Sequence, residues 1–249
     1  MERRTFLGIG FGALASPALS ALASCATGAL SRLTARPAAP TTMPPPLASR
    51  LGLGASRDGL LYVPASYTPR MAAPLLVALH GAGGSGASWR SLPERAERHG
   101  LIVLAPDSRA VTWDLVLGGF GPDVAFLDRA LRYTFQRCRI DPARIALGGF
   151  SDGASYALSL GVGNGDLFTH LIAHSPGFFR PEGPAVGRPR VFVSHGTQDT
   201  IIPVAISREG TVPELRRRGY GVVYREFDGP HAVPPQILGA ALDWFLGSA

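Results

Sequence analysis

The sequence contains no lysine, so all 24 of its basic residues are arginines. The arginines are scattered except for a cluster at 216–218, which is typical of a solvated helix end and does not indicate a nucleic-acid partner. Cysteine is scarce. Cys25 and Cys138 lie far apart, which excludes a disulfide framework and the paired spacing of a zinc site, so we expect no metal. Charged residues make up 17% of the chain against 46% hydrophobic ones, which excludes a disordered protein.

The first 24 residues have the order of an export signal. Arg3 and Arg4 precede an apolar run rich in glycine and alanine, which ends in small residues. The stretch RRTFL resembles the twin-arginine export motif of bacteria. The stretch LASC ends at Cys25 and resembles the lipoprotein processing box, which would make Cys25 the site of acylation and a membrane tether. Cleavage after Ala23 would instead release a periplasmic or extracellular protein, and an uncleaved transmembrane anchor is a third alternative.

Residues 25–50 are rich in proline, alanine and threonine and show no apolar period. This composition predicts an extended linker that holds the following domain away from its anchor. From residue 51 to residue 249 the pattern changes to buried strands that alternate with amphipathic helices. We therefore predict one folded domain over 51–249, with no internal repeat and no second domain.

This alternation predicts an α/β fold, with a doubly wound, mainly parallel sheet and helices on both faces. Ligands of such sheets bind outside the carboxyl ends of the strands. Seven polar residues come at predicted strand ends: His80, Asp107, Ser151, His174, His195, Asp199 and His231.

The pentapeptide GFSDG over 149–153 matches the pattern G-x-S-x-G. It follows a predicted strand and precedes a predicted helix, which is the context of a nucleophilic serine on a sharp turn. Glycines at 149 and 153 permit the close approach of strand and helix that such a turn requires. The alternative is an ordinary turn in which Ser151 only caps the helix.

A serine hydroxyl needs a base, and the base needs an acid that fixes its tautomer. On this architecture the chain order is serine, acid, histidine. Asp199 and His231 follow Ser151 in that order, each just beyond a predicted strand. His80, His174 and His195 all precede Asp199, so they do not fit as the base. Asp228 competes for the role of the acid, but a carboxylate three residues from His231 is more typical of a turn cap.

Ester cleavage also needs hydrogen-bond donors where the carbonyl oxygen gains negative charge. The glycine-rich loop HGAGG over 80–84 follows an early strand, and Gly81 lets its backbone approach a substrate closely. We predict the backbone N–H groups of Ala82 and Asp152 as the two donors. A phosphate-binding loop is the alternative, but the stretch lacks the Lys-Ser/Thr ending of a P-loop.

The stretches LHGAGG, GFSDGAS, HGTQD and DGPH, in this order, resemble the α/β-hydrolase fold. Within it they are most similar to small carboxylesterases near the phospholipase/carboxylesterase and polyhydroxybutyrate-depolymerase-like esterase families. The resemblance covers roughly residues 60 to 246. It implies Ser151 as nucleophile, Asp199 as acid and His231 as base, in a cofactor-free hydrolysis of carboxylic esters through an acyl-enzyme. A peptidase or amidase on the same fold and a non-catalytic surface-binding protein are the alternatives.

The expected substrate pocket is open. Only a connection-sized segment separates two late strands where many α/β-hydrolases carry a cap, so we predict no large cap domain and a site for short acyl esters or polymer ends. Trp113 and Phe178 are candidate pocket walls, and a core role for Trp113 is equally open.

Overall fold

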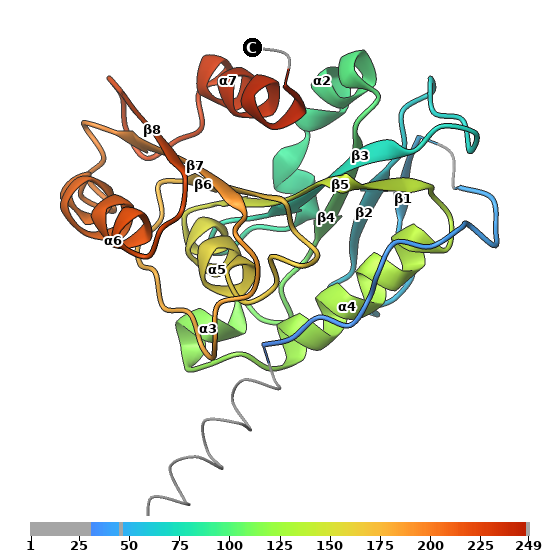
Figure 1. Cartoon of the computed structure of the whole chain (residues 1–249), viewed down its shortest axis with the longest axis horizontal. Coiled ribbons are helices and arrows are strands. Elements are labelled where there is room, and N and C mark those ends of the chain that lie inside the picture. The colour runs from blue at the N-terminus through green and yellow to red at the C-terminus, as the bar shows by residue number, and fades with distance from the viewer. Residues whose placement is uncertain (1–30, 45–46, 248–249) are drawn as a thin grey trace, which may run out of the picture.

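An eight-stranded sheet lies at the centre of the computed structural model, which describes residues 31–44 and 47–247 (Figure 1). The export signal predicted over 1–24 and the acylation of Cys25 lie outside the described residues. The strands are β1 (Ala48–Arg50), β2 (Gly59–Tyr62), β3 (Ala73–Leu79), β4 (Ile102–Pro106), β5 (Ile140–Phe150), β6 (His170–His174), β7 (Arg190–Gly196) and β8 (Val222–Phe227). Their order is β1-β2-β4-β3-β5-β6-β7-β8, and only β1 and β2 pair antiparallel to their neighbours.

Helices cover both faces of this sheet (Figure 1). The helices are α2 (Leu92–His99), α3 (Asp114–Leu117), α4 (Pro122–Phe135), α5 (Asp152–Gly161), α6 (Val212–Arg217) and α7 (Pro235–Leu246), with a 3₁₀ helix η1 (Gly86–Trp89) and a π-helical turn η2 (Ile206–Thr211). Successive side chains of a strand point to opposite faces. In β3, Leu75, Val77 and Leu79 therefore pack in the core with α3 to α6, while Leu76 and Ala78 pack with α2 and α7.

These observations confirm the predicted doubly wound, mainly parallel α/β sheet. They also agree with the absence of a large cap domain, because the described residues 175–189, between β6 and β7, contain no helix or strand. No helix in the described part of the chain is long and apolar enough to cross a membrane.

The linker prediction over 25–50 is wrong for the residues of that segment that the structure describes. Leu33 and Ala35 are buried in the main core, and the Asp128 carboxylate on α4 accepts the backbone N–H groups of Thr34 and Ala35. Residues 48–50 form β1, which pairs with β2. The segment from residue 31 runs beside α4 as an extended strap (Figure 1). A strap held by backbone hydrogen bonds and isolated apolar side chains needs no hydrophobic period, so the composition did not reveal it.

Candidate active site

Ser151 lies on a strained turn between β5 and α5. Its φ of 57° and ψ of −120° are sparsely populated for a residue with a side chain. A Cβ on Gly149 would lie 2.4 Å from the carbonyl oxygen of Gly153, and one on Gly153 would lie 2.4 Å from the carbonyl oxygen of Leu79. Neither position therefore accepts a side chain without a backbone shift. The backbone N–H of Ser151 donates to the carbonyl of His174 (2.9 Å), which ties the turn to β6.

Asp199 and His231 meet at the same end of the sheet. Asp199 follows β7, His231 follows β8, and the two side chains contact through Nδ1 and Oδ2 at 2.6 Å. The other carboxylate oxygen of Asp199 accepts the backbone N–H groups of Ile201 (2.9 Å) and Ile202 (2.8 Å). Burial alone would raise the pKa of Asp199, but the hydrogen bonds from Ile202, His231 and Ile201 outweigh it and lower this pKa below its ordinary value. Asp199 is therefore a carboxylate aimed at His231.

The imidazole of His231 lies beside the serine turn. Its ring centroid is 4.6 Å from that of Phe150, the residue before Ser151. Within residues 31–44 and 47–247 the structure has no hydrogen bond between the Ser151 hydroxyl and His231. Asp199 and His231, which follow β7 and β8, are thus in direct contact, and the ring of His231 packs against the residue that precedes Ser151 at the end of β5.

The glycine-rich loop after β3 lies next to Ser151. A Cβ on Gly81 would be 3.3 Å from the Cβ of Ser151. Gly83 N–H donates to Val111 and Gly84 N–H to Gly81, whereas the N–H groups of Ala82 and Asp152 have no acceptor in the part of the chain that the structure describes. The first N–H groups of a helix lack intrahelical partners, and Asp152 begins α5. The backbone N–H groups of the two predicted donors are therefore both unpaired among the described residues.

His80 holds this loop in place. Its Nε2 accepts the backbone N–H of Ser108 (3.0 Å), so its Nδ1–H is the atom that donates to the Gly81 carbonyl (2.7 Å). Burial lowers the pKa of His80. His80 is thus a neutral, buried structural residue.

Trp113 is fully buried, and its Nε1–H donates to the carbonyl of His80 (2.8 Å). Its ring packs against His80 and Tyr156. The prediction of Trp113 as a pocket wall is therefore wrong. The core alternative holds, because the indole spans the gap between the glycine-rich loop and α5. Asp152 turns its carboxylate to the Thr112 hydroxyl (2.6 Å), which leaves its backbone N–H as its contribution at the turn.

His195, which the sequence puts at a predicted strand end before Asp199, contacts that carboxylate in the structure. It is completely buried at the end of β7, and its Nε2 lies 2.8 Å from the Ile202 carbonyl and 3.2 Å from the Asp199 carboxylate. Its Nδ1 lies 2.7 Å from the Ser207 hydroxyl of η2. The spacing His-x-x-x-Asp was the available signal, because it puts both residues in one turn. Asp228, by contrast, is exposed and accepts a hydrogen bond from Gln198 (2.7 Å).

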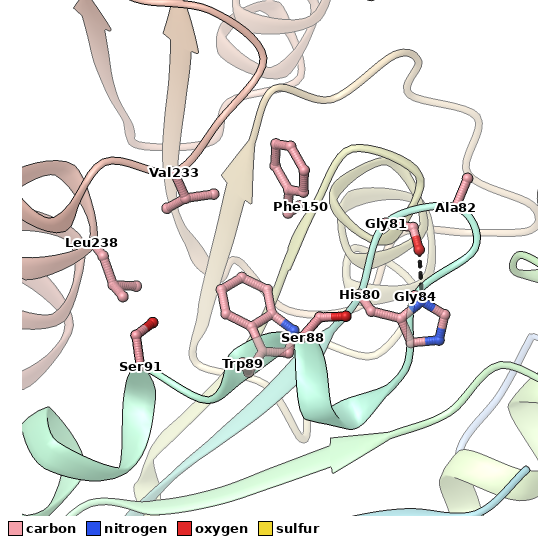
Figure 2. Close-up of a pocket in the computed structure, with 10 residues that line it drawn as sticks. All are labelled: His80, Gly81, Ala82, Gly84, Ser88, Trp89, Ser91, Phe150, Val233 and Leu238. Carbon is pink, nitrogen blue, oxygen red and sulfur yellow. Dashed lines mark hydrogen bonds between the residues drawn. The ribbon is translucent and has the colours of Figure 1, made fainter.

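A cavity of about 350 Å³ opens beside the serine turn (Figure 2). Its volume is at the lower end of the range of small-molecule sites. It is lined by His80, Gly81, Ala82, Gly84, Ser88, Trp89, Ser91, Phe150, Val233 and Leu238. Figure 2 shows Trp89 across the cavity from Phe150, with Leu238 and Ser91 at one end and the loop of Gly81 at the other.

Phe178, the other predicted wall residue, does not line this cavity. It is half-buried against the main core, with the guanidinium of Arg180 4.9 Å from its ring. No cluster of three or more histidine, cysteine or acidic side chains among the described residues has the arrangement of a metal site.

No family model matches the chain. Among curated proteins it is 30% identical over 105 residues to feruloyl esterase B of Thermothelomyces thermophilus, a match that covers 38% of this chain and 36% of the relative. It is 29% identical over 106 residues to an acetylxylan esterase of Coprinopsis cinerea, covering 38% of this chain and 28% of the relative. The matched segment thus spans only about a third of the length of these relatives.

Solved structures of esterases superpose on most of the chain. Esterase PE8 matches with a TM-score of 0.61 at 22% identity, covering 76% of this chain and 98% of PE8. A thermostable esterase matches with a TM-score of 0.67 at 22% identity, covering 81% of this chain and 62% of that one. A CE1 ferulic acid esterase from Anaeromyces mucronatus matches with a TM-score of 0.61 at 18% identity, covering 88% of this chain and 97% of that one. The chain therefore has the α/β-hydrolase fold of these esterases.

Proposed function

We propose that this protein is a serine hydrolase that cleaves carboxylic esters through an acyl-enzyme. The observation that carries the proposal is the 2.6 Å contact between His231 and Asp199, formed beside a serine with strained backbone angles. The curated relatives named above as feruloyl and acetylxylan esterases support the reaction class. The proposal assigns Ser151 as nucleophile, His231 as base and Asp199 as the acid that orients it.

In the first half of the reaction His231 Nε2 takes the hydroxyl proton of Ser151 as the Oγ attacks the ester carbonyl carbon. The π electrons of the ester carbonyl move to the carbonyl oxygen, which accepts hydrogen bonds from the backbone N–H groups of Ala82 and Asp152. The N-terminus of α5, which begins at Asp152, adds positive potential at the same place. The oxyanion then collapses, the bond to the alcohol oxygen breaks, and the imidazolium of His231 gives its proton to that oxygen.

In the second half a water molecule repeats these steps against the acyl-enzyme. His231 takes a proton from the water, and the water oxygen attacks the acyl carbon. Collapse of the second oxyanion breaks the bond to Ser151 Oγ, which recovers its proton from His231. Asp199 keeps the proton of His231 on Nδ1 throughout and stabilises the imidazolium. The chain itself supplies every group that these steps require.

The cavity beside the serine turn favours an uncharged ester with a short apolar group. None of its lining residues carries a formal charge when His80 is neutral, and Trp89, Phe150, Val233 and Leu238 supply apolar surface. The relatives, a feruloyl esterase and an acetylxylan esterase, point to acyl groups as different as feruloyl and acetyl. We propose short acyl esters or ester groups at polymer ends as the substrate class.

Replacement of Ser151 by alanine tests the function. We expect Ser151→Ala to abolish hydrolysis of p-nitrophenyl acetate and butyrate with an unchanged circular dichroism spectrum and melting temperature. A fluorophosphonate probe should label the wild type and leave this variant unlabelled. Ser175→Ala is the matched control, since Ser175 is a buried serine with φ of 50° just after β6, and it should retain activity. Undiminished activity of Ser151→Ala would exclude the mechanism. Hydrolysis of anilides in preference to esters would favour an amidase, and an unlabelled wild type would favour a binding protein.

A further inference from the structure

Trp89 separates two cavities. On one side lies the cavity beside the serine turn. On the other lies a second cavity of about 250 Å³ between η1 and the β2–β4 side of the sheet. The second cavity is lined by Ala48, Leu60, Tyr62, Gly86, Ala87, Trp89, Arg90, Leu92, Pro93, Val103 and Ala105. Among the described residues only Trp89 lines both, so its indole is the partition between them.

The second cavity is apolar although it lies near the surface. Leu60, Val103 and Ala105 supply its sheet wall, and Leu92 and Pro93 supply the wall from α2. The one phenol in its lining, Tyr62, uses its hydroxyl in a 2.6 Å hydrogen bond to Glu97. Apart from the exposed Arg90, the lining offers a polar ligand few partners, whereas a hydrocarbon chain would bury apolar surface against the sheet and α2.

The indole is held at the partition by packing alone. Trp89 is half-buried against the core of α2 and α7, but its Nε1–H is buried without a hydrogen-bond partner in the described part of the chain. Buried indole N–H groups are normally paired, and an unpaired one costs free energy. No hydrogen bond of the indole therefore fixes the ring in place, and packing alone holds it where it lines both cavities.

We propose that Trp89 sets the maximum length of the apolar chain in the ester substrate, and that the second cavity receives longer chains when the indole is removed. This inference rests on the proposed ester hydrolysis and concerns its specificity. In this proposal a short chain lies between Phe150 and Trp89, which face each other across the cavity (Figure 2). A longer linear chain would meet the indole, because the larger apolar space next to it is the second cavity of about 250 Å³, whereas the narrow cavity that Trp89 and Leu238 also line holds only about 10 Å³. Trp89 is thus a specificity-determining residue, and the group it limits is either the acyl chain or the alcohol chain.

The experiment compares two series of esters on the full chain. One holds p-nitrophenol as the alcohol and lengthens the acyl chain from acetate to decanoate. The other holds acetate as the acyl group and lengthens a linear alcohol over the same range of carbon numbers. In the wild type we expect kcat/KM to fall steeply with length in one series. In Trp89→Ala, kcat/KM for the ester with an eight-carbon chain, divided by kcat/KM for the shortest ester of that series, should rise at least tenfold. The series that responds shows whether Trp89 limits the acyl chain or the alcohol chain.

Two further variants test the route of the chain. In a Trp89→Ala background, Ala87→Phe places a ring at the exposed edge of the second cavity and should return the ratio to the wild-type value. Trp244→Ala is the matched control for loss of a tryptophan. Trp244 is also partly buried against the same core with an unpaired Nε1, yet it lines neither cavity, so its replacement should leave the length profile unchanged.

The outcomes separate this inference from the proposed function. A wild type without Ser151-dependent ester hydrolysis would refute the function itself. Ser151-dependent hydrolysis with an unaltered length profile in folded Trp89→Ala would refute the role of Trp89 alone. A tenfold rise that Ala87→Phe fails to reverse would refute the second cavity as the receiving site. If Trp89→Ala does not fold, Trp89→Leu provides the test, since it shortens the partition less and should give a smaller shift in the same direction.

Discussion

Replacement of Asp199 by asparagine is the sharpest test of the site. One carboxylate oxygen accepts two backbone N–H groups, from Ile201 and Ile202, and the other faces Nδ1 of His231. Turning the new amide N–H₂ toward the two backbone donors would leave both unpaired, at about 1–3 kcal/mol each. The asparagine carbonyl therefore keeps those two bonds, and its N–H₂ group points at His231.

This orientation forces His231 into the wrong tautomer. With a donor opposite Nδ1, the imidazole accepts there and carries its proton on Nε2, where it cannot take the proton of Ser151. The loss in kcat should be on the order of 10⁴-fold, which corresponds to about 5.5 kcal/mol of transition-state stabilisation. The assay is p-nitrophenyl acetate hydrolysis, with circular dichroism to confirm the fold.

Asp228→Asn is the control for this substitution, because Asp228 is exposed and bonds only to Gln198 among the described residues. The kcat of Asp228→Asn should remain within about twofold of the wild-type kcat. A kcat of Asp199→Asn within tenfold of the wild-type kcat would refute the reasoning. A loss of kcat in Asp228→Asn larger than that in Asp199→Asn would assign the role of the acid to Asp228.

Two further predictions concern stability, measured by urea unfolding. Leu33→Ala should lower the free energy of unfolding by about 2–4 kcal/mol, because Leu33 fixes the strap to the core and is 1% exposed. Met43→Ala, in the same segment but 78% exposed, should change it by less than about 0.5 kcal/mol, and equal effects would contradict the packing of the strap. Burial raises the pKa of Asp123 to about 6, so folding favours its protonated form. Protonated Asp123 therefore adds to the free energy of unfolding below about pH 4, and this contribution is lost as the pH rises through 6. Between pH 4 and 7 the free energy of unfolding of the wild type should fall by up to about 3 kcal/mol relative to that of Asp123→Asn. Parallel pH profiles of these two proteins would show that Asp123 titrates normally.

The strained serine turn shows what local sequence can predict. The glycines at 149 and 153 indicate a close crossing of strand and helix, and in the structure a Cβ at either position would lie 2.4 Å from a backbone oxygen. The positions of Asp199 and His231 follow from the same logic. Parallel strands bring their carboxyl ends to one edge of the sheet, so residues far apart in the chain meet there without a local signal for the contact.

Other contacts depend on the tertiary structure. From the sequence Trp113 is equally a pocket wall or a core residue, and its complete burial and the hydrogen bond from its indole to the His80 carbonyl decide for the core. The partition at Trp89 exists because η1, α2 and the β2–β4 side of the sheet converge around one side chain. The strap from residue 31 is held by Asp128, a residue of α4 far along the chain.

The sequence by itself determined the alternation of strands and helices, the serine turn and the order of serine, acid and histidine. These features arise from periodicity and from the backbone freedom of glycine, which act over a few neighbouring residues. Only the tertiary structure decided which aromatic side chains are buried, which cavity adjoins the serine, and where the amino-terminal strap docks. Burial and cavity shape are set by contacts between residues distant in the chain, and no short-range pattern encodes them.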